Sequence, residues 1–227
     1  MALATSRRVY IAVVTRGHPH FMSSAAMAAL NGRAGAQPDY VWGNDIPHSR
    51  NVAVSRFLAL DSTFGHMLFI DDDTAPPADA LKKLLALNTD IATGVTPIKR
   101  NDLLMANVSN ARLRERFAHW FPPLWPTGVF DVDACGTSCM LIRRAVLERL
   151  SAPVFPSGDD HDTAFCARAV QAGFTILCDA SVRCEHYHIV EIGKLANCHD
   201  EQGYDSLRAV ASYDRLCNPP KEYSCES

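Results

Sequence analysis

Short apolar runs recur along the first hundred residues, and their lengths suit buried strands. They occupy residues 9–14, 66–70 and 90–95, and residues 39–42 form a shorter candidate. The first run, Val-Tyr-Ile-Ala-Val-Val, is rich in β-branched residues, as strands covered on both faces are. The pattern therefore predicts four strands in this part of the chain.

The segments between these runs have the spacing of amphipathic helices. Residues 21–30 are rich in alanine and methionine, and the Asn-Gly pair at 31–32 should end that helix. Ser49 suits the N-cap of a second helix, and the Pro pair at 76–77 opens a third. Strands that alternate with helices of about ten residues predict βαβ units and a mostly parallel sheet, whose ligands bind beyond the carboxyl ends of the strands.

The second half of the chain is less periodic. Residues 99–126 combine prolines and aromatic residues without a clean period, which predicts a long loop. We expect further strands at 130–132, 140–142, 174–178 and 182–184, and helices at 143–150, 160–172 and 206–216.

Composition narrows the class of protein. The 227 residues carry a formal net charge of -3, which argues against nucleic-acid binding through bulk charge. No apolar run reaches the roughly 18 residues that span a bilayer, and no secretory signal is recognisable. The eight cysteines form no CxxC pair, so we expect reduced thiols and a cytoplasmic protein.

The strongest chemical signal is the triplet Asp71-Asp72-Asp73, which directly follows the apolar run 66–70. Adjacent carboxylates repel one another unless a cation neutralises them. In extended or turning backbone, Asp71 and Asp73 project to one side and Asp72 to the other. Two oxygen donors on one side suit Mg²⁺ or Mn²⁺ held jointly with a diphosphate. The alternative is a solvated acidic turn that caps the next helix.

Two further clusters carry ionisable groups. Residues 158–162, Gly-Asp-Asp-His-Asp, precede the helix expected at 160–172, where carboxylates serve as caps or as a general base. His186 and His188 end a predicted strand on the same side of the chain. Their spacing with nearby cysteines fits no standard zinc site, so one histidine that completes an aspartate-held metal site is favoured.

Basic residues lie near the same predicted edge of the sheet. Arg16 follows the first strand, and Arg50 and Arg56 lie in the second helix. They can serve the diphosphate or base of a nucleotide, or they can be ordinary surface arginines.

Taken together, these pieces resemble the GT-A glycosyltransferases, in particular small enzymes of the bacterial and phage type. The resemblance covers roughly residues 9–190, and where the family usually has Glu-Asp this chain has Asp159-Asp160. In chain order the matching pieces are Val14-Thr15-Arg16, Ser49-Arg50-Asn51, HMLFIDDDTAPP, VDACGTSCMLIRR, GDDHDTAFCARAVQAGF and VRCEHYH.

The resemblance implies an α/β, Rossmann-like GT-A fold, with a mostly parallel central sheet flanked by helices. It implies a single domain over residues 1–227. About residues 1–98 would form the nucleotide-sugar-binding half and about 99–190 the acceptor and catalytic half. Residues 191–227 would form a C-terminal tail or helix.

The resemblance also implies roles for individual residues. Asp71 and Asp73 match the DxD motif, which would hold Mn²⁺ or Mg²⁺ together with His186 or His188. Asp160, next to Asp159, matches the acid that deprotonates the acceptor hydroxyl in inverting members. The nucleotide-diphosphate sugar, with a UDP-sugar as the first expectation, would contact Thr15, Arg16, Arg50, Asn51, Asp71, Asp72 and Gly136.

Two other functions stay open at this point. A sugar-phosphate nucleotidyltransferase shares the sheet and the acidic ligands, but residues 14–18 do not form the Gly-rich loop typical of that class. A non-catalytic module that binds metal or sugar is the other. The acceptor of a transferase would be a glycan, a protein or a modified DNA base, for which Arg112, Arg114 and Arg116 offer a basic strip.

Overall fold

The computed structural model describes residues 8–34, 38–100, 103–109 and 127–187. The chain divides into two units, Met1–Tyr187 and His188–Ser227, and every described residue belongs to the first. His188, the tail at 191–227 and the helix expected at 206–216 lie outside the described residues. The single domain over the whole chain therefore stays a prediction.

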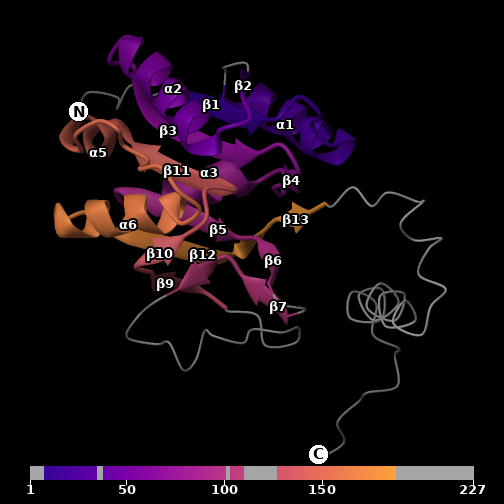
Figure 1. The fold of residues 1–227 in the computed structure, drawn as a ribbon. Helices are drawn as coiled ribbons and strands as arrows, with labels where there is room; N and C mark the ends of the chain where they lie inside the picture. The colour runs from indigo at the N-terminus through magenta and orange to yellow at the C-terminus, as the bar shows by residue number, and fades with distance from the viewer. Residues whose placement is uncertain (1–7, 35–37, 101–102, 110–126, 188–227) are drawn as a thin grey trace, which may run out of the picture. The chain divides into compact units, whose positions relative to one another are not determined.

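Strands and helices alternate through the first half, as the sequence pattern predicts (Figure 1). The helices are α1 (Phe21–Ala34), α2 (Ile46–Ala59), α3 (Ala80–Ala86), α5 (Arg144–Arg149) and α6 (His161–Gln171). The strands are β1 (Arg8–Thr15), β2 (Asp39–Trp42), β3 (Phe64–Asp71), β4 (Thr74–Ala75), β5 (Ile91–Val95), β6 (Pro97–Arg100), β7 (Leu103–Ala106), β8 (Val108–Ser109), β9 (Val129–Asp131), β10 (Ala134–Cys135), β11 (Cys139–Arg143), β12 (Ile176–Arg183) and β13 (Glu185–His186).

A seven-stranded sheet in the order β2-β1-β3-β11-β5-β12-β9 forms the centre of the fold. β1 is parallel to β2 and β3, and β12 is parallel to β5, whereas β11 and β9 are antiparallel to their neighbours. The mostly parallel sheet flanked by helices is thereby confirmed.

The register of the first three strands brings their carboxyl ends to one edge. Val14 of β1 lies opposite Val41 of β2 and Asp71 of β3. Parallel strands in register end together, so the loops after β1, β2 and β3 are neighbours in space. The acidic triplet is delivered to this edge, where open α/β sheets bind their ligands.

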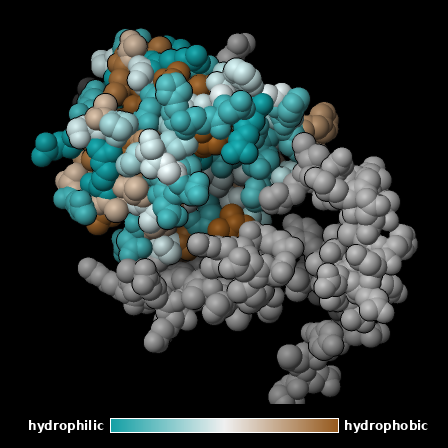
Figure 2. All heavy atoms as spheres, viewed as in Figure 1, coloured by the Kyte–Doolittle hydropathy of each residue, from teal (hydrophilic) through white to brown (hydrophobic). Residues whose placement is uncertain are grey.

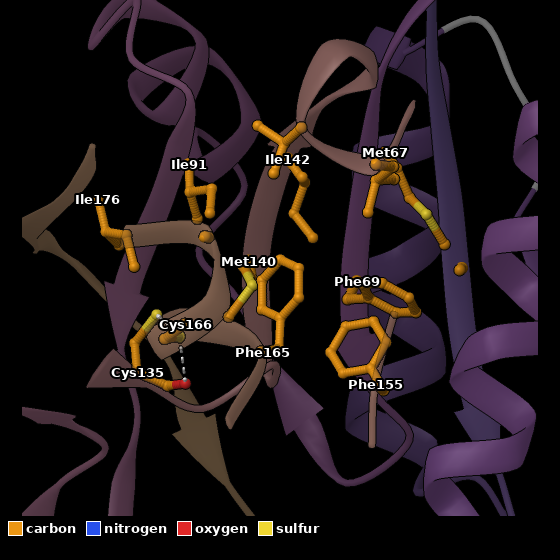
Figure 3. Packing of buried hydrophobic residues seen from close by; sticks show 14 of the residues in the cluster. Met67, Phe69, Ile91, Cys135, Met140, Ile142, Phe155, Phe165, Cys166 and Ile176 are labelled. Atoms are coloured by element: carbon orange, nitrogen blue, oxygen red, sulfur yellow. Dashed lines mark hydrogen bonds between the residues drawn. The ribbon is translucent and has the colours of Figure 1, made fainter. Parts of the chain in front are cut away.

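Both faces of the sheet are covered, and β1 shows how. Side chains alternate along a strand, so Ile11 joins the apolar cluster covered by α1 and α3, while Ala12 joins the cluster under α2 and α6. The rings of Phe69, Phe155 and Phe165 pack in series in the second cluster (Figure 3), with centroids 5.5 Å and 4.7 Å apart. The side of the described residues seen in Figure 2 is mostly hydrophilic.

Two expected helix boundaries are wrong. α1 continues through the Asn-Gly pair at 31–32 and ends at Ala34. Asp45, not Ser49, caps α2, because the Asp45 side chain accepts the His48 N–H. Ser49 lies inside the helix, where its hydroxyl donates to the Asp45 carbonyl at 2.9 Å. The start of α2 at Ile46 places Pro47 in the first turn of the helix, where proline is well tolerated.

Other departures come from pairing between distant segments. The expected strands at 174–178 and 182–184 are one strand, β12, whose pairing with β5 is irregular between Cys178 and Arg183. Part of the expected loop at 99–126 forms strands β6 to β8, and residues 110–126 lie outside the described residues. A third expected helix boundary is also wrong, and pairing is not its cause: α3 starts at Ala80, after the Pro pair at 76–77 rather than at it.

Two further findings concern membrane-spanning helices and the cysteine thiols. No helix in the described part of the chain is long and apolar enough to cross a membrane. Five cysteines are described, and all are buried and free: Cys135, Cys139, Cys166, Cys178 and Cys184. Burial raises the pKa of the Cys178 thiol well above its usual range.

Candidate active site

The acidic turn, residues 71–73, is held by its backbone. Each of its three carbonyl oxygens accepts a hydrogen bond, two from the start of α1 and one from the residue after β13, so the carboxylates are not needed to fix the turn. The donors are the Ser23 hydroxyl to Asp71 (3.3 Å), the His20 N–H to Asp72 (2.8 Å) and the Tyr187 N–H to Asp73 (2.9 Å).

Asp73 and His186 face each other. β13 pairs antiparallel with β4, which places His186 opposite Thr74. His186 Nε2 lies 3.2 Å from Asp73 Oδ2, and His186 Nδ1 lies 2.8 Å from the Pro97 carbonyl oxygen. A carbonyl only accepts, so Nδ1 carries a proton and, in the neutral ring, the Nε2 lone pair points toward Asp73. In the protonated ring, the hydrogen bond that Nε2 donates to Asp73 outweighs burial and raises the pKa of His186 above its ordinary value.

This pair suits a divalent cation that also takes ligands from a substrate. Metal-binding histidines usually donate their other ring nitrogen to a carbonyl or carboxylate, as His186 does to Pro97. Within the described ranges, no group of three or more His, Cys, Asp or Glu is gathered to hold a metal. Among the described residues, Asp73 and His186 are the two donors that face each other, which leaves positions for diphosphate and water oxygens, the usual surroundings of Mg²⁺.

Arg50 joins the acidic turn to α6. Its side chain is only 4% exposed; Nη2 lies 3.2 Å from Asp71 Oδ1, and Nη1 donates to Asp162 Oδ1. The other oxygen of Asp162 accepts the Thr137 N–H at 3.3 Å. A buried arginine therefore links the end of β3 to the first turn of α6 and to the loop between β10 and β11. The Arg50 guanidinium is engaged by carboxylates, and its contact with a diphosphate stays a prediction.

The two carboxylates on Arg50 have different pKa values. Burial raises the pKa of Asp71, helped by the nearby charges of Asp162 and Asp73 and opposed by Arg50. Burial also acts to raise the pKa of Asp162, but hydrogen bonds from His161 and Thr137 and the charge of Arg50 outweigh it. The net pKa of Asp162 is lowered, so it stays ionised.

Asp72 points toward the loop after β1. The Thr15 hydroxyl donates to Asp72 Oδ2 at 2.6 Å and accepts the Gly17 N–H at 2.9 Å. Gly17 has φ +108°, and a Cβ there would lie 2.9 Å from Trp42 Nε1. Trp42 packs against this glycine and is still 69% exposed. The three carboxylates of the acidic turn therefore reach three different partners.

The remaining predicted residues lie in varied settings. Asn51 is committed to structure: its amide donates to the Pro47 and Phe155 carbonyls, and its oxygen accepts the Phe155 N–H. Gly136 donates its N–H to the Asn107 carbonyl. Arg16 is exposed after β1. His188 lies outside the described residues.

Asp159 and Asp160 lie exposed at the start of α6. Asp160 occupies the N-cap position, but its side chain makes no capping hydrogen bond. Sequence reasoning missed the contact of Asp162 with Arg50 and Thr137, although Asp162 belongs to the same acidic cluster. It also missed His20 and Tyr187, whose only sequence signal is proximity to predicted site residues.

Comparison with known proteins assigns the sequence to a family. The model of the family described as Glycosyltransferase like family 2 matches residues 44–200. No curated protein matches the sequence significantly. Among solved structures, A197 from STIV superimposes with a TM-score of 0.60 and 17% identity, covering 80% of this chain and 86% of that one.

Two glycosyltransferase structures share the fold at lower identity. GalNAc-T7 with UDP, GalNAc and Mn²⁺ has a TM-score of 0.52 and 9% identity, covering 83% of this chain and 45% of that one. The catalytic domain of Drosophila β1,4-galactosyltransferase 7 in complex with xylobiose has a TM-score of 0.52 and 13% identity, covering 81% and 71%. These likenesses concern the fold, whereas the family match covers well over half of the sequence. The chain belongs to Glycosyltransferase like family 2 and is a glycosyltransferase with a GT-A fold.

Proposed function

We propose that this glycosyltransferase is metal-dependent and moves a sugar from a nucleotide-diphosphate sugar to an acceptor hydroxyl. Asp73 and His186 would hold the cation, and Asp160 would act as the base. The observation that carries the proposal is the 3.2 Å approach of His186 Nε2 to Asp73 Oδ2, with His186 Nδ1 committed to Pro97. The UDP and Mn²⁺ named for the GalNAc-T7 structure support a UDP-sugar and Mn²⁺ as the first ligands to test.

The nucleotide would lie along the loops after β1 and β2. Asp72 and Thr15 are joined at 2.6 Å beside the cation ligands, so they are placed to receive the ribose or the sugar. Trp42 offers an exposed aromatic face at the end of β2, held against Gly17, on which a nucleobase can stack. Arg16, exposed on the same loop, can meet a phosphate.

Transfer breaks the bond from the anomeric carbon to the diphosphate and forms a bond to the acceptor oxygen. When bound, a divalent cation supplies Lewis-acid stabilisation of the negative charge on the departing diphosphate. Asp73 and His186 would fix where that charge develops, and hydrogen bonds from Ser23, His20 and Tyr187 to its three carbonyls hold the acidic turn in place. The acceptor hydroxyl loses its proton to a carboxylate as its oxygen attacks.

Asp160 is better suited than Asp162 to accept that proton. Asp162 is bound by Arg50, His161 and Thr137, and its lowered pKa makes it a weak proton acceptor. Asp160 is exposed at the start of α6 without a capping hydrogen bond, so its carboxylate can turn to a substrate. Asp159 is exposed beside it and is the second candidate.

Calorimetry of UDP binding with and without Mn²⁺ tests the metal site. We expect Asp73→Ala to abolish the Mn²⁺-dependent part of the affinity, because one of the two protein ligands is lost. Asp61→Ala is the matched control, since Asp61 is exposed just before the opposite end of β3. Equal Mn²⁺-dependent affinity in Asp73→Ala and the wild type would refute the site.

Product analysis tests the reaction. Release of UDP from a UDP-sugar in the presence of Mn²⁺ is the expected outcome. Formation of pyrophosphate from a nucleoside triphosphate and a sugar phosphate would show a nucleotidyltransferase instead. If neither product forms, the protein is a module that binds metal or sugar without transferring a group. An acceptor screen by mass gain would then separate glycans, proteins and modified DNA bases.

A further inference from the structure

The rings of His20 and Tyr187 stack beside the acidic turn. Their centroids are 4.2 Å apart and their planes differ by 9°. His20 comes directly before α1, and Tyr187 directly follows β13, so the stack joins two distant parts of the chain. Neither residue is a ligand of the proposed cation, and the function described above uses their backbone N–H groups but not their rings.

The same two residues also bind consecutive carbonyls of the acidic turn. The His20 N–H donates to Asp72 and the Tyr187 N–H donates to Asp73. Backbone and rings together form a closed circuit of four residues around the turn, which we name the aromatic clasp. If the two rings separated, the His20 and Tyr187 N–H groups would no longer hold each other in place through the stack.

His186 depends on this support more than a residue in a long strand would. β13 consists of Glu185 and His186, and among the described strands it pairs with the two-residue β4, so few ladder hydrogen bonds hold it. The Nδ1 bond to Pro97 fixes the ring on one side. On the other side, Tyr187 is the next residue, so its stack on His20 limits the backbone that carries His186.

The His20 ring is itself held by the start of α1. The Met22 N–H donates to His20 Nδ1 at 3.3 Å. The ring is thus anchored to α1, which packs on the sheet through Met27 and Leu30. Tyr187 therefore stacks on a surface that is connected to the core rather than on a loose loop.

We propose that His20 and Tyr187 are positioning residues that keep His186 and Asp73 in the geometry that binds the cation. The proposal rests on the proposed metal site. An aromatic pair is worth enough to change the population of an ordered state by about 2- to 10-fold. Loss of either ring should weaken the apparent Mn²⁺ affinity by a similar factor, because only the ordered fraction binds.

The experiment measures Mn²⁺ binding by electron paramagnetic resonance, in the presence of UDP, for His20→Ala and Tyr187→Ala. Two controls are matched to them. Tyr187→Phe keeps the ring and removes the hydroxyl that contacts Glu185, and His18→Ala removes an exposed histidine from the same loop. We expect about 2- to 10-fold weaker binding in both alanine variants and wild-type affinity in both controls. The double alanine variant should be no weaker than the single ones.

Hydrogen exchange of the Tyr187 amide gives a readout that needs no metal. This amide donates to the Asp73 carbonyl, so its exchange rate should be several-fold higher in His20→Ala than in His18→Ala. Unchanged exchange and unchanged Mn²⁺ affinity in His20→Ala would overturn the clasp while leaving the metal site standing. A wild-type chain that binds no Mn²⁺ would overturn the metal site, and with it the role assigned to the clasp.

Discussion

Three neighbouring carboxylates in the acidic turn have three separate tasks. Asp71 pairs with the buried Arg50, Asp72 accepts the Thr15 hydroxyl, and Asp73 faces His186. The expected projection of Asp72 away from its neighbours agrees with these contacts. Arg50 relieves the repulsion within the triplet at Asp71, and the proposed cation would act at Asp73.

Asp160→Asn separates binding from chemistry. An amide cannot accept the proton of the acceptor hydroxyl, so we expect transfer to fall by about 10²- to 10⁴-fold while UDP affinity is unchanged. The measurements are calorimetry and turnover with the acceptor found by mass gain. Asp159→Asn is the control and should lose much less. Wild-type turnover in Asp160→Asn would place the base elsewhere.

His161 gives a pH dependence of stability. The hydrogen bond to Asp162 raises the pKa of His161 above 6.5, although burial opposes it. A raised native pKa stabilises the fold fully below the unfolded value and loses that contribution as pH rises through the native pKa. The free energy of unfolding of the wild type should therefore exceed that of His161→Gln most below pH 6.5.

Urea denaturation at several pH values measures this difference. The difference in free energy of unfolding between the wild type and His161→Gln should shrink steadily as the pH is raised above 6.5. His18→Gln, at an exposed position, serves as the control and should show no such trend. A difference between wild type and His161→Gln that grows toward alkaline pH would show that neutral His161, not the protonated form, is stabilised.

At the scale of elements, α5 supports the end of α2. Arg144 of α5 donates to the carbonyls of Phe57, Leu58 and Leu60 at the carboxyl end of α2, and to Phe64 at the start of β3. A cation at a helix carboxyl end meets the negative end of the helix dipole. Because α2 also carries Arg50, the contacts of Arg144 help to hold the helix that positions Arg50 in the site.

Replacing Arg144 by methionine tests this connection. Several charge-assisted hydrogen bonds are lost while the volume is kept, so we expect a loss of about 2 kcal/mol in the free energy of unfolding. Urea denaturation is the measurement, and the exposed Arg149→Met of the same helix should change stability little. Equal stabilities of the two variants would contradict a capping role for Arg144.

At the scale of the molecule, one arginine connects the two halves of the site. Arg50 and Asp162 are separated by 112 positions in sequence, yet the buried Arg50 pairs with the part-buried Asp162, and Asp71 completes the group. Breaking a buried pair leaves an uncompensated charge, which costs more than the pair itself contributes. This connection sets the position of α6 relative to the acidic turn.

A double-mutant cycle measures the connection. Arg50→Met and Asp162→Asn should each cost about 3 kcal/mol, and the double variant should cost about 1–3 kcal/mol less than their sum. The exposed pair Arg56 and Asp39, with variants Arg56→Met and Asp39→Asn, should couple by less than about 1 kcal/mol. Additive effects at Arg50 and Asp162 in urea denaturation would show that they do not interact.

Much of the fold is predictable from the sequence because β1, β3 and β5 are covered on both faces. Burial on both faces produces uninterrupted apolar runs, and these mark a strand whatever its neighbours are. The expected Asp39–Trp42 agrees with β2 in both bounds. Prediction failed where pairing decides the structure, as in β6 to β8 and in the irregular β12.

The candidate site divides in the same way. The acidic turn was recognisable because three charges directly after a buried strand are costly without a partner. The pairing of Asp162 with Arg50 was not recognisable, because a carboxylate in a first helical turn is also a common cap. The stack of His20 on Tyr187 has no local pattern at all, since each is a single ring in an irregular segment.

The sequence by itself determined which segments are strands and helices, and it determined that the carboxylates leave β3 at the ligand-binding edge. Periodicity and charge are local properties, so they can be read along the chain. Only the tertiary structure decided that Asp73 meets His186 and that Arg50 meets Asp162. Those contacts depend on the strand order β2-β1-β3-β11-β5-β12-β9 and its registers, which bring together residues that no local pattern relates.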